Sequence, residues 1–234
     1  MKKRILLILL TLSTLLSLAG CGKEPHNLLR EIECGGRIYC VRGSSMRAKR
    51  IVVKENDEVI WSERVKVDSS VGTQNGTYGF DVLDLNFDGF VDFLIADDVA
   101  GDCISYKCWL WDSTEGDYVL SEDLTGLCNV RIDVKMEALF AFAHTYETEK
   151  EYADVPATTT TSDSTTKYIW QDGALIPQIR ASITYFSETN LYLYSVAYYN
   201  EETKSLEADY TKEQWLTPEE YKTHDMSFLY YFKN

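Results

Sequence analysis

The sequence predicts an all-β fold, arranged as a curved antiparallel meander with one short helix near the C-terminus. Most of the 234-residue chain alternates apolar and polar residues with a period of two, and polar turns separate these segments. Tyr, Phe and Trp number 16, 9 and 5, and aromatic side chains favour half-buried sheets. A single signal for the start of a helix lies near the C-terminus, so we expect strands almost throughout.

A hairpin is the first element that the pattern predicts. Residues 50–54 and 59–67 alternate on either side of the polar tetrad 55–58, with sequence ENDE. The same pattern predicts further strands at residues 78–85, 91–95, 106–111, 117–121, 130–134, 138–146, 166–170, 174–185, 191–199 and 228–232.

Two segments interrupt the strand pattern. Residues 156–166 are nearly all Thr and Ser, which predicts a mobile hairpin loop, with glycosylation as the alternative. Thr217 and Glu220 have capping-box spacing around Pro218, which predicts a short helix that extends to Lys222.

The first 20 residues have the pattern of an export signal. A basic start, Lys2 to Arg4, precedes an apolar stretch at residues 5–16 that is too short to span a membrane. Residues 18–21, Leu-Ala-Gly-Cys, resemble the bacterial lipobox. That resemblance implies cleavage before Cys21 and a diacylglycerol on its sulfur, which anchors the protein stably. The alternative is an ordinary secretory signal in which Cys21 is a structural thiol.

After cleavage, residues 21–29 are predicted to be a lipid-anchored tether and residues 30–234 a single β domain. Loss of three basic residues changes the net charge from −14 to −17. This acidity argues against nucleic acid or an anionic membrane face as a partner, and it suits divalent cations or basic proteins.

The remaining cysteines favour disulfides, because an exported protein meets an oxidising compartment. Cys34 with Cys40, and Cys103 with Cys108, are close enough in sequence to form small loops, which leaves Cys128 unpaired unless the connectivity differs. Zinc is the rival interpretation, but the chain has no Cys-x-x-Cys and no histidine near either pair.

The most informative motif is the acidic loop at residues 84–92, with sequence DLNFDGFVD. Alternating oxygen donors suit a hard cation such as Ca²⁺, and Gly89 permits the turn around it. An EF-hand is excluded, because its twelfth position would be Ile95 and both flanks alternate as strands. The predicted metal ligands are the side chains of Asp84, Asn86, Asp88 and Asp92 and the carbonyl of Phe90.

The loop resembles the calcium loops of FG-GAP and integrin-α-type β-propeller repeats, whose motif Asp-x-Asp/Asn-x-Asp-Gly-x-x-Asp joins two strands of a blade. The wider order of residues 80–95, 106–112, 117–119 and 170–173 is similar to a group of small secreted bacterial proteins and lipoproteins. That group carries one such loop on a β-propeller-like fold, so the resemblance implies a β-propeller-like fold as the alternative to the curved meander. One of its branches comprises periplasmic inhibitors that protect cells from lysozyme-like toxins.

Two other interpretations of the loop stay open. It could be a metal-free acidic turn, in which Asp and Asn serve turn chemistry alone. The calcium could also be purely structural, because millimolar extracellular calcium fills even weak sites.

Catalysis has little support in the sequence. No Gly-x-Ser-x-Gly motif and no phosphate-binding glycine loop is present, and His144 in its apolar strand suits a structural role. We therefore expect no enzyme but a lipid-anchored, extracytoplasmic calcium-binding interaction module on the bacterial membrane or outer surface. The alternatives are an inhibitor of a lysozyme-like, basic cell-wall hydrolase and a glycosidase-like enzyme with two facing carboxylates.

Overall fold

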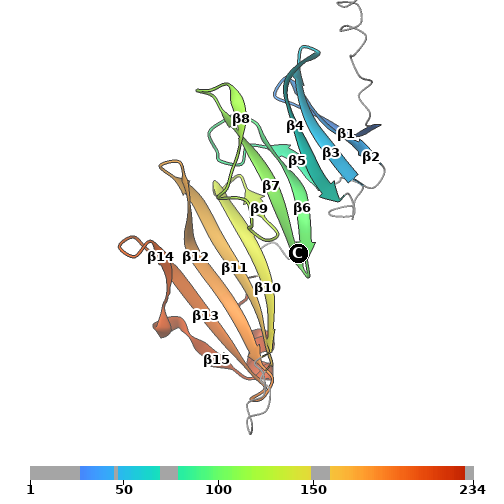
Figure 1. The fold of residues 1–234 in the computed structure, drawn as a ribbon. Coiled ribbons are helices and arrows are strands. Elements are labelled where there is room, and N and C mark those ends of the chain that lie inside the picture. Colours follow the sequence, from blue (N-terminus) through green and yellow to red (C-terminus); the bar gives the residue numbers. More distant parts are fainter. Residues whose placement is uncertain (1–26, 45–46, 69–78, 149–158, 230–234) are drawn as a thin grey trace, which may run out of the picture.

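The computed structural model describes residues 27–44, 47–68, 79–148 and 159–229, and it is an all-β protein built from three antiparallel sheets (Figure 1). The N-terminal sheet is a four-stranded meander with strand order β1-β2-β3-β4. Its strands are β1 (Asn27–Cys34), β2 (Arg37–Ser44), β3 (Arg47–Glu55) and β4 (Glu58–Asp68). The predicted hairpin is confirmed by β3 and β4, whose two-residue turn places Asn56 and Asp57 at φ of 50° and 67°.

The middle sheet is a second four-stranded meander, with strand order β5-β6-β7-β8. Its strands are β5 (Phe80–Leu83), β6 (Asp92–Ala100), β7 (Cys103–Asp112) and β8 (Asp117–Leu120). Residues 92–96 of β6 are all buried, because this strand lies inside the sheet and both faces of the sheet are covered.

The C-terminal sheet has seven strands in the order β14-β13-β12-β11-β10-β9, and β15 also pairs with β13. Its strands are β9 (Arg131–Asp133), β10 (Ala138–Thr148), β11 (Thr159–Gln171), β12 (Ala174–Phe186), β13 (Leu191–Asn200), β14 (Ser205–Ala208) and β15 (Gln214–Leu216). A 3-10 turn, η2 (Tyr210–Lys212), precedes β15, and the helix α2 (Pro218–Thr223) follows it. The predicted capping box is present, since Thr217 and Glu220 exchange hydrogen bonds at the start of α2.

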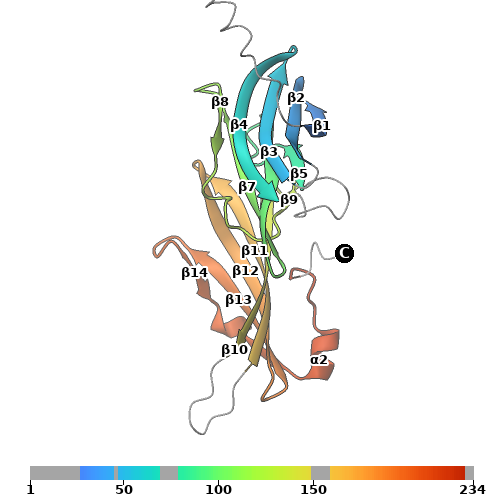
Figure 2. The same ribbon diagram turned by 45° about the vertical axis from the view of Figure 1, so that its right-hand side comes forward.

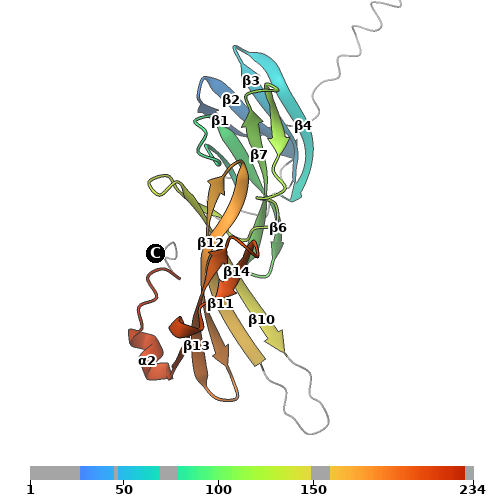
Figure 3. The same cartoon turned by 90° about the vertical axis from the view of Figure 1, so that its left-hand side faces the viewer.

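The three sheets follow one another along an elongated molecule (Figures 1 and 3). One core joins the N-terminal and middle sheets, and Phe93 lies at its centre, with ring centroids 5.2 Å from Trp109 and 4.9 Å from Tyr118. A second core, around Leu94 and Leu139, joins the middle and C-terminal sheets. The middle sheet is thus a layer packed on both faces.

A third core lies on the C-terminal sheet itself, where α2 covers one face (Figure 2). Tyr192 of β13 stacks on Tyr221 of α2, with ring centroids 4.2 Å apart. Among the described residues, no helix is long and apolar enough to cross a membrane.

Several sequence predictions were wrong in their boundaries. β1 begins at Asn27, inside the predicted tether 21–29. β11 begins at Thr159, so most of the predicted Thr- and Ser-rich loop 156–166 is a strand, paired on both sides by β10 and β12. Residues 228–229 lie in a turn, and the rest of the predicted strand 228–232 is outside the described residues.

Candidate functional site

The acidic loop connects β5 to β6 as a strand–loop–strand unit, with Leu83 and Asp92 as the last pair of the ladder. Phe87 and Gly89 both have positive φ, 61° and 87°, which bends the backbone sharply between the strands. Phe87 packs against the second core, so the strained turn is held from within the molecule. The unit is not an EF-hand, as the sequence predicted.

The first half of the loop folds around its own side chains. Asp84 accepts hydrogen bonds from the backbone N–H of Asp88 at 3.2 Å and of Gly89 at 2.8 Å. Asn86 donates to the Asp88 carboxylate at 2.9 Å, and Asp88 also accepts from the N–H of Phe90 at 2.8 Å. Three predicted ligands therefore lie together on the exposed side of one turn.

The fourth predicted ligand, Asp92, is fully buried. One carboxylate oxygen accepts from the N–H of Leu85 and the other from the N–H of Trp111, both at 2.8 Å. Burial raises the pKa of Asp92 to about 7; the two backbone donors lower it, and the negative charges of Asp88 and Asp84 raise it further. The buried carboxylate of Asp92 thus lies within the electrostatic influence of the carboxylates of Asp88 and Asp84.

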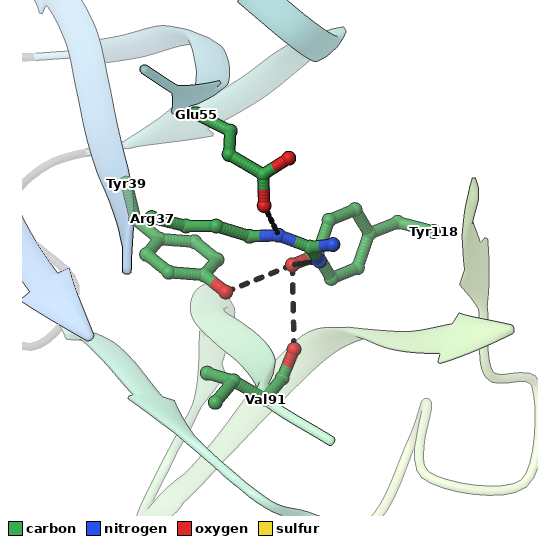
Figure 4. Close-up of polar contacts among 5 residues, drawn as sticks. All are labelled: Arg37, Tyr39, Glu55, Val91 and Tyr118. Atoms are coloured by element: carbon green, nitrogen blue, oxygen red, sulfur yellow. Dashed lines mark hydrogen bonds and ion pairs between the residues drawn. The ribbon is translucent and has the colours of Figure 1, made fainter. Parts of the chain in front are cut away.

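The end of the loop is bound to the N-terminal sheet by a polar network (Figure 4). The Val91 carbonyl accepts from the hydroxyl of Tyr118 at 3.3 Å. That hydroxyl lies 2.8 Å from the hydroxyl of Tyr39 and accepts from Nη1 of Arg37 at 3.1 Å. Arg37 also pairs with Glu55 through Nε at 3.2 Å. The network is consistent in direction: Tyr118 donates to Val91, so Tyr39 donates to Tyr118.

Aromatic and backbone contacts strengthen this connection. The guanidinium carbon of Arg37 lies 3.8 Å from the ring centroid of Trp111, and the backbone N–H of Trp111 donates to Asp92. At the β1–β2 turn, Gly35 approaches so closely that a Cβ there would lie 3.0 Å from Cγ2 of Val91. Burial lowers the pKa of Arg37, but its hydrogen bonds to Tyr118 and Glu55 raise it, and the net shift is upward. Arg37 therefore stays protonated.

The start of the loop is bound to the C-terminal sheet. The indole N–H of Trp170 in β11 donates to the carbonyl of Leu85 at 2.9 Å. The loop has hydrogen bonds to the middle sheet through Asp92 and Val91, and to the C-terminal sheet through Leu85. It is linked to the N-terminal sheet through Tyr118, whose hydroxyl also bonds to Arg37 and Tyr39 of β2. The loop therefore lies where the three sheets meet.

The donors of this loop fit a hard cation chemically, because all are carboxylate or amide oxygens and no Lys or Arg neutralises them within the described residues. Their arrangement is held by internal hydrogen bonds, and no group of three or more acidic, His or Cys side chains has metal-binding spacing in the described part of the chain. Phe90 is part of the same turn, and its side chain is 44% exposed.

The predicted disulfides were wrong in their pairing. Cys103 is bonded to Cys128, while Cys34, Cys40 and Cys108 are free thiols. The lipidation candidate Cys21 lies outside the described residues.

Strand geometry explains the wrong pairings. In the β1–β2 ladder, Cys34 lies opposite Arg37 and Cys40 opposite Glu31, so the two sulfurs are three pairs apart. At about 3.4 Å per residue this is roughly 10 Å, beyond the reach of a disulfide. Cys103 and Cys108 lie in the same strand, five residues apart, which is farther still.

Two surface cavities lack the two facing carboxylates of a glycosidase. The first, lined partly by Asn129, Arg131 and Phe142, has Asp102 as its one carboxylate. The second, lined partly by Tyr185 and Tyr192, has Asp163. Neither brings two carboxylates face to face, so neither supports glycoside hydrolysis. His144 forms a 2.5 Å contact with Asp163 across β10 and β11.

Sequence reasoning missed the network of Arg37, Tyr39 and Tyr118. Its members are separated by 79 and 81 positions in the chain, and isolated Arg and Tyr residues carry no spacing signal. One local signal existed: the Gly35-Gly36 pair predicts a tight turn and hence a hairpin before residue 50.

Comparison with known proteins gives a fold but no family. No family model matches the sequence, and no curated protein matches it. The fold is similar to a solved structure described as that of a Xanthomonas type IV secretion system related protein. The TM-score is 0.51 at 11% sequence identity, over 77% of this chain and 92% of the other. At this identity the similarity concerns the fold alone.

Proposed function

We propose that the protein is a lipid-anchored, extracytoplasmic interaction module whose three-sheet arrangement is stabilised by Ca²⁺ at the acidic loop. Side-chain oxygens of Asp84, Asn86, Asp88 and Asp92 and the carbonyl of Phe90 would hold the ion. Its charge would offset the mutual repulsion of the three carboxylates. Cys21 would carry the lipid.

The observation that carries this proposal is the environment of Asp92. Its carboxylate is fully buried, close to two further carboxylates, and no described basic side chain pairs with it. A buried carboxylate without a counter-charge is costly, and a cation is the usual remedy. Because the loop bonds to the middle and C-terminal sheets and is linked to the N-terminal sheet through Tyr118, the effect of the ion would extend beyond the hairpin.

Calorimetric melting with calcium or with EDTA tests the proposal. At a calcium concentration of ten to one hundred times Kd, the linkage contribution is about 1.4–2.7 kcal/mol. For a chain of this size that is a rise in Tm of roughly 3–10 °C. Asp88→Ala should abolish the rise.

Asp112→Ala is the matched control. Asp112 lies in the exposed β7–β8 turn and caps the N–H groups of Thr114 and Glu115 in a similar way, but it is not in the loop. This variant should keep the full calcium response. Identical melting curves of the parent protein in calcium and in EDTA would contradict the calcium proposal.

A second candidate function is inhibition of a basic, lysozyme-like cell-wall hydrolase. Residues 79–130 contain 12 acidic residues and one basic residue. At the edge strand β8, Val119 and Leu120 are 52% and 39% exposed, and they lie between exposed acidic residues. Apolar contacts with an acidic rim suit a basic protein partner.

Protection of cells or cell walls against lysozyme-type lysis tests this second function. Reversal of charge at Glu122 and Asp123, both to Lys, should abolish protection, because it replaces attraction by repulsion beside β8. The same change at Glu201 and Glu202, exposed in the β13–β14 turn, alters net charge equally and should leave protection intact. Equal loss in both variants, or no protection by the parent protein, would contradict this function.

A further inference from the structure

The outer face of the N-terminal sheet carries three arginines in direct cross-strand register. Arg42 of β2 lies opposite Arg50 of β3, and Arg50 lies opposite Arg64 of β4. Their chain neighbours Val41, Ile51 and Val65 point into the core between the sheets, so alternation places the arginines on the other face. We call Arg42, Arg50 and Arg64 the arginine row.

The arginine row is an unfavourable arrangement for folding alone. Like charges directly opposite one another in a sheet are destabilising. Neither Arg50 nor Arg64 has an ion pair with any residue that the structure describes, and Arg64 is exposed. By alternation Lys66 and Lys54 belong to the same face, while Glu31 and Glu33 are its acidic members along β1.

This face is electrically different from the rest of the molecule. Residues 27–68 contain nine basic and seven acidic residues, whereas residues 79–130 contain one basic and twelve acidic residues. The net charge of −14 therefore conceals a basic end and a strongly acidic body. An anionic surface would attract the first and repel the second.

The predicted lipid anchor identifies the membrane as the anionic surface that lies nearest to this face. Only five residues lie between Cys21 and the first residue of β1, Asn27, and these six steps along the chain reach roughly 20 Å. The N-terminal sheet is therefore the part of the molecule that the anchor keeps closest to the bilayer, within a few Debye lengths of its surface.

We propose that the outer face of the N-terminal sheet, centred on the arginine row, binds the anionic phospholipid headgroups of the membrane that holds the anchor. This inference rests on the proposed lipid anchor for its orientation. The anchored protein would stand with its N-terminal sheet on the lipid and its acidic middle and C-terminal sheets directed away. The lipid would supply the counter-charge that Arg50 and Arg64 lack among the described residues.

Sedimentation with vesicles tests the proposal without the anchor. The mature chain from residue 21, with Cys21→Ser, is mixed with vesicles of phosphatidylcholine alone or with an equal part of phosphatidylglycerol. Binding to the anionic vesicles only is expected, and it should weaken as salt is raised. The triple variant Arg50→Gln, Arg64→Gln, Lys66→Gln should bind roughly 100-fold more weakly, at about fivefold per basic side chain.

The matched control is Lys135→Gln, Lys204→Gln, Lys222→Gln, which removes the same charge from exposed positions of the C-terminal half. It should bind like the parent. The variant Arg50→Gln, Arg64→Gln, Lys66→Gln should melt at or above the parent Tm, because repulsion is relieved, so its lost binding would not reflect unfolding.

Three outcomes would overturn the inference: no binding to anionic vesicles at low salt, equal weakening in both triple variants, or tighter binding to random duplex DNA than to the vesicles. Failure of the lipid anchor is seen separately, by the mass of Cys21 in protein from membranes. An unmodified Cys21 with intact vesicle binding would sink the anchor and leave the lipid-binding face standing.

Discussion

The hydroxyl of Tyr118 serves three partners at once. It donates to the Val91 carbonyl and accepts from Arg37 and Tyr39, and so one oxygen joins the acidic loop to the N-terminal sheet. Tyr39 is completely buried and Tyr118 is 5% exposed, so no water is at hand to replace a lost partner. Burial accordingly raises the pKa of both phenols, and they stay protonated donors at neutral pH.

Tyr118→Phe should therefore lower the free energy of unfolding by about 2 kcal/mol, because it leaves the Tyr39 hydroxyl and the Val91 carbonyl without their partner. Urea denaturation measures this. Tyr210→Phe is the control, since Tyr210 is 78% exposed, and it should change stability by less than about 0.5 kcal/mol. In the Tyr39→Phe background, Tyr118→Phe should cost less; strict additivity would show that the hydroxyls are not coupled.

At the scale of single residues, the sequence was enough to identify the loop residues, but not the contacts that hold them in place. The spacing of Asp84, Asn86 and Asp88 is local, so it could be recognised without a structure. That Asp92 would be buried and capped by Trp111 depends on β7 lying beside β6, which spacing does not encode.

Among the elements, the β1–β2 hairpin is notable for how closely its turn approaches the loop. Gly35 and Gly36 both have positive φ, 59° and 77°, but only Gly35 faces a neighbour, since nothing lies within 4 Å of a Cβ built at Gly36. Backbone strain and close approach can therefore be separated by two adjacent substitutions.

Gly36→Ala should cost about 1 kcal/mol from the left-handed backbone alone. Gly35→Ala should cost about 1 kcal/mol more, because the added methyl also pushes on Val91. The measurement is the free energy of unfolding in urea. Equal costs for the two variants would show that the turn does not press on the loop.

The Cys103–Cys128 bridge closes a segment with a sequence separation of 25. On the chain-entropy model such a bridge contributes about 3.5 kcal/mol. The double variant Cys103→Ser, Cys128→Ser should be less stable by about that amount, whereas Cys34→Ser should cost under about 1 kcal/mol. Peptide mapping without reduction should recover one linked pair, and a Cys34–Cys40 peptide would contradict the structure.

Elements with a strong local pattern were predictable, and those defined by their partners were not. Residues 55–58 identify their hairpin because Asn and Asp tolerate the required φ. Residues 159–165 carry only small hydroxyl side chains and one Asp, and they form a strand because β10 and β12 flank them over their whole length. β14 and β15 are three- to four-residue strands at an edge, too short for periodicity to show.

For the molecule as a whole, the all-β meander was predictable, because period-two alternation recurs along most of the chain. Its surface electrostatics were not. Net charge argued against an anionic membrane face, but charge is a sum and the sheets separate its parts: the arginine row lies on one sheet and most acidic residues on the others. The pairing register of the strands determines where the charges lie on the surface, and amino-acid composition contains no information about register.

The double packing of the middle sheet should make unfolding cooperative. Amides of β6 and β7 should exchange hydrogen only through global unfolding, because opening either core exposes this sheet. Amides of β14, a four-residue edge strand, should exchange faster through local opening. Hydrogen-exchange mass spectrometry measures both, and faster exchange in β6 than in β14 would contradict this view.

The packing of the middle sheet limits how the chain can be divided into stable fragments. A fragment that starts at residue 79 would leave Phe80, Phe93 and Trp109 facing water, and one that stops at residue 68 would lose the other half of the same core. Neither piece should be soluble by itself, yet each carries the complementary surface of the other. Co-expressed as two polypeptides, they should reassemble, which would make residues 69–78 a natural place to cut the gene for a split reporter.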